Sequence, residues 1–251
     1  MKLLCNIIIL NLFFSNLFAF QPDSLIKTGN NLYAKGIYNL AINAYEQIVD
    51  SGYQASELFF NLGNAYYKSN NIPYAILNFE RAKLLDPFDD DIEHNLALAN
   101  AYVVDKIDVI PEFFLNRWLR NFSSITSSDI WAICSISAFI IFLLFFMGYL
   151  FFYRLGLKKV SFWLGLLLFF ISLSSFYLSL KRKQFLTLNN SAVIITPTLT
   201  VKSSPNESGN DLFIIHEGTI VNIEDSISDW NQIKIGNGNK GWIRRSDLIK
   251  I

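Results

Sequence analysis

The sequence predicts a multidomain membrane protein in which an all-α helical-repeat solenoid is followed by an α-helical transmembrane hairpin and then by a small all-β barrel. Three observations predict this order. Apolar and small residues recur every 34 residues near the start of the chain, which is typical of stacked helical hairpins. Two long apolar runs without charge follow. Short β-branched runs separated by Gly, Asn, Ser and Pro make up the C-terminal part.

The N-terminal segment is typical of a secretory signal. Met1-Lys2 provides a short basic start, an apolar run extends to Phe18, and the small Ala19 precedes the polar Gln21. This order predicts a signal peptide over residues 1–19. The alternative is an uncleaved signal anchor, and either version exports the chain that follows.

An internal repeat follows the signal. Gly29 and Gly63 lie 34 residues apart, as do Ala41 and Ala75. Small residues at these positions let two helices approach closely, and this spacing resembles the tetratricopeptide (TPR) repeat. We expect repeats over 22–55 and 56–89 and a half repeat over 90–104, with helices at 23–35, 39–51, 56–69, 73–85 and 90–104.

Stacked TPR hairpins form a concave groove lined by the first helix of each pair. The resemblance places five protein-binding candidates in this groove: Asn30, Tyr33, Phe60, Asn64 and Tyr67. An Asn side chain donates to and accepts from the backbone of an extended peptide, so it holds a peptide without reading its sequence. Alternatively, both Asn residues are ordinary solvated side chains on a helix surface.

Residues 105–129 join the repeats to the first apolar run. Between Phe113 and Phe122, apolar side chains alternate with Arg117 and Arg120 at helical spacing. This pattern predicts an interfacial helix that lies on a bilayer. The same apolar face equally suits packing against the last repeat helix.

The two apolar runs predict transmembrane helices over residues 130–153 and 160–180, joined by a basic loop at 154–159. Two spans return the chain to its starting side, so both flanking domains lie on one side of the membrane. The basic loop favours the cytoplasm, although Lys181-Arg182-Lys183 makes the flank equally basic. The secretory start decides between these two orientations, because it exports the first domain. We therefore expect a bacterial inner-membrane protein with periplasmic domains.

Residues 192–251 predict the barrel. The segments Glu217-Gly218-Thr219 and Gly241-Trp242-Ile243, separated by an Asn-Gly hairpin turn, resemble a bacterial SH3-like domain. Trp230 and Arg244 are the candidates for ligand contact, and the alternative is that both pack in the core or rim. His216 is expected to be structural, because no Ser, Cys or metal partner accompanies it.

The bulk composition excludes several classes of function. Lys plus Arg and Asp plus Glu both number 21, and this zero net charge disfavours binding to nucleic acid. The sequence has no Ser/His/Asp or Cys/His arrangement, no metal-ligand spacing and no glycine-rich phosphate loop. We therefore expect no catalytic residue, no metal and no cofactor, and a protein that is not an enzyme.

The order of parts resembles the BatE-like proteins of the aerotolerance-operon group. Three segments carry the resemblance beside the architecture: Asn61-Leu-Gly-Asn-Ala-Tyr-Tyr67, Asn95-Leu-Ala-Leu-Ala99 and Leu212-Phe-Ile-Ile-His-Glu-Gly218. The resemblance implies a scaffold of an envelope complex, with von Willebrand A domain membrane proteins and a MoxR-type ATPase as partners in stress or aerotolerance. The alternative is a cell-wall protein, whose barrel binds peptidoglycan while its groove recruits an enzyme.

Overall fold

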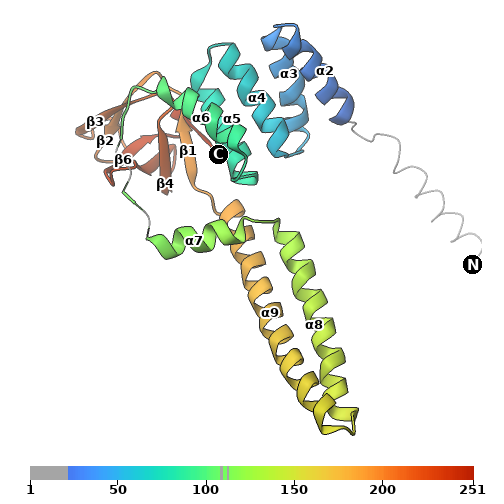
Figure 1. Cartoon of the computed structure of the whole chain (residues 1–251). Coiled ribbons are helices and arrows are strands. Elements are labelled where there is room, and N and C mark those ends of the chain that lie inside the picture. Colours follow the sequence, from blue (N-terminus) through green and yellow to red (C-terminus); the bar gives the residue numbers. More distant parts are fainter. Residues whose placement is uncertain (1–21, 108–109, 112) are drawn as a thin grey trace, which may run out of the picture.

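The computed structural model describes residues 22–107, 110–111 and 113–251, so the expected signal peptide at 1–19 lies outside the described residues. In this part of the chain, eight α-helices, labelled α2 to α9, precede one seven-stranded antiparallel sheet (Figure 1). The predicted sequence of a helical part, two long apolar helices and an all-β part is confirmed at this level.

Five helices form two antiparallel pairs and a single last helix, which together we call the helical unit. Gly63 explains how closely one pair packs, because an added Cβ would lie 2.7 Å from the ring of Phe79. Asp89 caps the last helix by accepting hydrogen bonds from the backbone N–H groups of Asp91 and Ile92. The helices are α2 (Pro22–Ala34), α3 (Tyr38–Asp50), α4 (Ser56–Lys68), α5 (Ile72–Leu85) and α6 (Asp90–Ala101).

Helices α8 (Ser128–Phe151) and α9 (Leu155–Thr187) run side by side as a hairpin that projects away from the rest of the chain (Figure 1). Both are long and apolar enough to cross a membrane, and only 11% and 22% of their apolar windows are buried. A core helix of a soluble protein would bury most of that surface. Both the helical unit and the sheet lie at the same end of this hairpin.

Helix α9 is longer than the expected span at 160–180. It begins at Leu155, inside the segment 154–159 expected as a basic loop, and it continues to Thr187. The connection between the two long helices is therefore shorter than expected. Because the helical hydrogen bonds continue through Lys181-Arg182-Lys183, these three cations stand on a rigid helix.

Serine side chains bind the two long helices to each other. Ser135 Oγ donates to the carbonyl of Ser172, and Ser172 Oγ donates to the carbonyl of Ser135, both at 2.9 Å. Ser179 Oγ donates to the carbonyl of Ser128 at 2.8 Å. In an apolar surrounding, such interhelical bonds hold together helices that no hydrophobic effect drives together.

The sheet, which we call the β domain, has the strand order β3-β2-β6-β5-β4-β1-β7. Its inward side chains form one apolar core that includes Ile194, Ile215, Ile233 and Ile243. In β5 the buried Asn231 and Ile233 alternate with half-buried residues, as the two-residue period of a strand requires. In β1, by contrast, Ala192, Val193 and Ile194 are all buried. The strands are β1 (Ser191–Ile194), β2 (Thr198–Lys202), β3 (Asp211–His216), β4 (Ile220–Ile227), β5 (Trp230–Lys234), β6 (Lys240–Arg244) and β7 (Leu248–Lys250).

The β domain packs directly against the helical unit, a contact that the sequence did not predict. Val193 of β1 lies in the same buried cluster as Ile76 of α5. Gly218, at a φ of 82°, fits the junction because an added Cβ would lie 3.1 Å from the side chain of Ile76. Arg81 of α5 donates a 2.9 Å hydrogen bond to the carbonyl of Lys250. The two parts therefore form one body.

Candidate functional site

The five predicted groove residues lie on the first helices of the pairs. Asn30 and Tyr33 are on α2, and Phe60, Asn64 and Tyr67 are on α4. Helix α4 contacts both α2 and α6, so these first helices are neighbours and share one face of the helical unit. The fold thus places the predicted residues on a common face.

The carbonyl oxygens of both Asn side chains are used within the protein. Asn30 Oδ1 accepts a 2.6 Å hydrogen bond from the hydroxyl of Tyr45, and Asn64 Oδ1 accepts one of 2.8 Å from Asn95 Nδ2. Burial raises the pKa of Tyr45 to about 12, so its hydroxyl remains a donor at neutral pH. Among the described residues neither Asn amide nitrogen donates to a protein atom, so both amide donors are available to a bound peptide.

Aromatic contacts orient Tyr33 and Tyr67, two of the three remaining groove candidates. The rings of Tyr33 and Tyr38 meet edge to face with centroids 5.4 Å apart. The ring of Tyr67 meets that of Tyr102 in the same manner at 6.0 Å. Such contacts hold aromatic side chains in place beside the Asn donors.

The structure also brings together the two ligand candidates of the β domain. Trp230 on β5 and Arg244 on β6 are cross-strand partners, and the guanidinium carbon lies 5.7 Å from the centre of the indole ring. Arg244 Nε also donates a 2.8 Å hydrogen bond to Glu207. Trp230 is half-buried, whereas Trp242 is buried in the core. The result is a rim of the half-buried Trp230 and the exposed Arg244, whose positive charge already pairs with Glu207.

His216 takes part in a junction that sequence reasoning missed. Its backbone N–H and its Nδ1 donate to the carboxylate of Asp105, at 2.7 and 2.9 Å. Thr219 Oγ1 donates to the same carboxylate at 2.7 Å. Burial opposes ionisation of Asp105, but these hydrogen bonds outweigh it and hold the pKa of the carboxyl below its ordinary value. Asp105 therefore fastens the end of the helical unit to the turn between β3 and β4.

Arg182 is a second residue whose role the sequence concealed. Although it stands in a basic run, its side chain is only 3% exposed. It donates to the carbonyls of Leu84 and Leu85 at 3.1 and 2.9 Å, and to Ser124 Oγ at 3.0 Å. These carbonyls end α5 and have no intrahelical partner, and a cation is favourable at a helix C-terminus. Arg182 thus connects the long hairpin to the helical unit.

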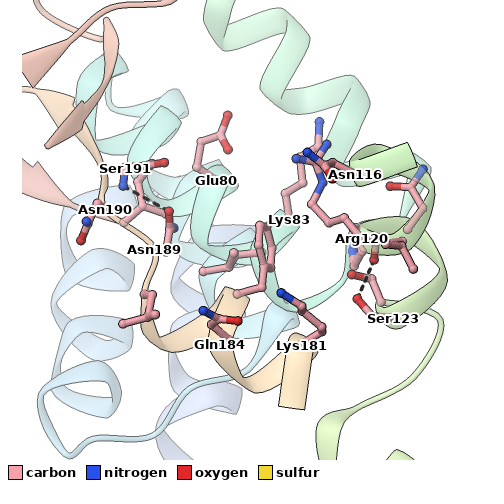
Figure 2. Close-up of a pocket in the computed structure, with 18 of the residues that line it drawn as sticks. Glu80, Lys83, Asn116, Arg120, Ser123, Lys181, Gln184, Asn189, Asn190 and Ser191 are labelled. Carbon is pink, nitrogen blue, oxygen red and sulfur yellow. Dashed lines mark hydrogen bonds between the residues drawn. The ribbon is translucent and has the colours of Figure 1, made fainter. Parts of the chain in front are cut away.

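A cleft of about 1080 Å³ lies where α5, the short helix α7 (Phe114–Ser123) and the end of α9 meet. Figure 2 shows Lys83, Arg120 and Lys181 among the side chains around it, together with Glu80, which lies on the same helix as Lys83. Amide and hydroxyl side chains complete the polar lining: Asn116, Asn121, Ser123, Ser124, Gln184, Asn189, Asn190, Ser191 and Asn222. Among the described lining side chains, Lys83, Arg120 and Lys181 are cationic and Glu80 is acidic.

Helix α7 bears on the two interpretations of the segment 105–129. Its large apolar side chains are exposed, with Phe114 at 72% and Trp118 at 58% of their surface. These side chains are therefore not buried against the last repeat helix, which was one of the two alternatives. An amphipathic helix with an uncovered aromatic face suits the interface of a bilayer.

The described residues contain no group of three His, Cys, Asp or Glu side chains that would hold a metal ion. Neither a protein-family profile nor a curated protein matches the chain. The resemblance to the BatE-like proteins therefore stays a prediction, and so does the assignment of the helical unit as TPR repeats.

Proposed function

We propose that the chain is a membrane-anchored adaptor of the bacterial inner membrane, whose TPR-like helical unit and SH3-like β domain collect partners on the periplasmic side. The observation that supports this proposal best is that both units are fused into one body at the same end of an apolar hairpin. Arg182 and Asp105 hold this body in place. A rigid, anchored pair of binding surfaces suits a protein that brings partners together.

The partners we propose are envelope membrane proteins with von Willebrand A domains and a MoxR-type ATPase. They follow from the resemblance of the sequence to the BatE-like proteins. The helical unit would hold an extended peptide through the free amide donors of Asn30 and Asn64, beside the aromatic rings of Tyr33, Phe60 and Tyr67. Backbone hydrogen bonds of this kind retain a peptide irrespective of its side chains.

The test is a mild-detergent pull-down of the full-length protein from its native membranes. The double variant Asn30→Asp/Asn64→Asp retains the oxygen that accepts from Tyr45 and Asn95 but lacks the amide donors, so the fold keeps its contacts. We expect it to lose partners that the wild type retains. The matched control, Asn39→Asp/Asn43→Asp, places the same charges on exposed positions of α3 and is expected to retain them.

A second candidate function is binding of peptidoglycan by the β domain. The observation in its favour is the rim of the half-buried Trp230 and the exposed Arg244, because aromatic and cationic side chains suit the sugars and carboxylates of cell-wall peptides. Sedimentation of the protein with purified sacculi tests it. Loss of sedimentation in Trp230→Ala, with no loss in Asn30→Asp/Asn64→Asp, would assign this activity to the β domain.

The periplasmic location has its own test. Protease added to spheroplasts should degrade both the helical unit and the β domain, because the hairpin places them on one side. Protection of both would reverse the topology but leave their shared sidedness intact.

A further inference from the structure

The cleft between α5, α7 and α9 is not used by either adaptor surface. Lys83 comes from α5, Arg120 from α7 and Lys181 from α9, so three separate segments converge on it (Figure 2). The chain as a whole has zero net charge, with 21 basic and 21 acidic residues. Neither Lys83 nor Lys181 forms an ion pair within the described part of the chain, so both ammonium groups are available to an anionic ligand.

Aromatic contacts hold Lys181 and Arg120 at the cleft. Lys181 Nζ lies 5.8 Å from the centre of the Tyr177 ring, and the Arg120 guanidinium carbon lies 5.9 Å from the centre of the Phe185 ring. Cations over aromatic faces are stabilised electrostatically and lose less freedom on binding a ligand. Both rings also line the cleft, so charge and apolar surface stand together.

The cleft lies at the level where a bilayer would present its phosphates. Lys181 directly follows the apolar run expected to span the membrane at 160–180. The exposed aromatic face of α7, with Phe114 and Trp118, marks the same level beside it. Apolar lining residues, Leu119 and Leu188 among them, adjoin the cations and suit the glycerol and the first methylene groups of a lipid.

We propose that this cleft binds the phosphate headgroup of an anionic phospholipid from the leaflet beside the two domains, with Lys83 and Lys181 as its cationic ligands. Basic pockets beside transmembrane helices recognise such headgroups. The proposal rests on the membrane placement of α8 and α9, and it does not depend on the adaptor role.

Glu80 is compatible with this ligand. Burial raises the pKa of its carboxyl group, and the neighbouring Lys83 opposes this rise only in part. A raised pKa reduces the negative charge that would repel a phosphate. Amide and hydroxyl groups around the cleft, such as Asn116, Gln184 and Asn190, offer further donors to phosphate oxygens.

The test counts lipids retained by the purified full-length protein in native mass spectrometry, after incubation with equal amounts of phosphatidylglycerol and phosphatidylcholine. We expect the wild type to prefer phosphatidylglycerol, with each lysine contributing about fivefold. Lys83→Gln/Lys181→Gln should abolish this preference, and Lys83→Arg/Lys181→Arg should retain it. The matched control is Lys158→Gln/Lys159→Gln at the opposite end of the hairpin, which should leave the preference unchanged.

Three results would overturn the proposal. The first is that the wild type shows no preference for phosphatidylglycerol. The second is that the Lys158→Gln/Lys159→Gln control loses as much of this preference as the cleft variant. The third result is that the wild type shows no lipid preference, while inorganic phosphate alone raises its melting temperature but not that of the Lys83→Gln/Lys181→Gln variant. That result would assign the cleft to a soluble anion. Release of the protein from membranes by alkaline carbonate would instead refute the membrane placement itself.

Discussion

Replacing Arg182 with alanine should undock the helical unit from the hairpin. The side chain is 3% exposed and makes three hydrogen bonds, two to the last carbonyls of α5 and one to Ser124. A hydrogen bond from a charged donor contributes about 1.5–3 kcal/mol. Desolvation of the guanidinium offsets part of this sum, and its Nε makes no hydrogen bond within the described part of the chain. We therefore expect a loss of about 3 kcal/mol of docking free energy.

Hydrogen–deuterium exchange of the full-length protein in nanodiscs measures this loss. A change of about 3 kcal/mol corresponds to roughly 100-fold faster exchange for amides that are exposed only by undocking, such as those in the last turn of α5. Lys183→Ala is the matched control, because Lys183 is the exposed cation next to Arg182 on the same helix. Unchanged exchange at the end of α5 in Arg182→Ala, or an equal increase in the control, would refute the role assigned to Arg182.

Three further predictions concern single contacts. Asp105→Asn should lower the free energy of unfolding in urea by about 2 kcal/mol at pH 7. The pKa of Asp105 is lowered in the folded state, so its contribution to stability is complete above the ordinary aspartate pKa and is lost as the pH falls through the folded pKa. The free energies of unfolding of wild type and variant should therefore converge as the pH falls below about 4. A difference that stays constant with pH would contradict this prediction. Gly63→Ala should lower the melting temperature, because the added Cβ would lie 2.7 Å from the Phe79 ring. Such overpacking costs about 1–3 kcal/mol, which exceeds the gain in helix propensity from glycine to alanine. A higher melting temperature would show that the ring moves freely. Ser135→Ala/Ser172→Ala should weaken the association of α8 with α9 by about 0.6 kcal/mol for each hydrogen bond lost. Crosslinking of cysteines placed on the two helices measures this association. An unchanged crosslinking yield would show that apolar packing suffices.

The candidate surfaces were predictable to different degrees. The 34-residue period placed Asn30 and Asn64 at equivalent positions, and the structure puts both on one face because equivalent residues of stacked hairpins share a face. The sequence named Trp230 and Arg244 as ligand candidates, but their pairing depends on the register of the β5–β6 hairpin, which its turn sets. The cleft was not predictable, since Lys83, Arg120 and Lys181 are distant in sequence and no local pattern connects them.

Arg182 and Asp105 show the same limit at the level of single residues. In the sequence, Arg182 is one of three adjacent cations, and only the position of α5 decides that it is buried while Lys181 and Lys183 remain exposed. Asp105 lies in a connecting segment without any pattern, and its role at the junction depends on the hydrogen bonds it accepts from His216 and Thr219. A side chain reveals such a role only when its partners, remote in the chain, have been placed beside it.

Local chemistry by itself determined which elements form: helices from a period that repeats, two apolar helices from charge-free runs, and strands from β-branched residues between turns. The even number of apolar helices then predicted that the two flanking parts lie at the same end of the hairpin. Only the tertiary structure decided that these parts merge into one body and that a basic cleft opens beside the hairpin. The physical reason is that periodicity reports on each element alone, whereas packing between elements depends on shape and charge brought together across long separations in sequence.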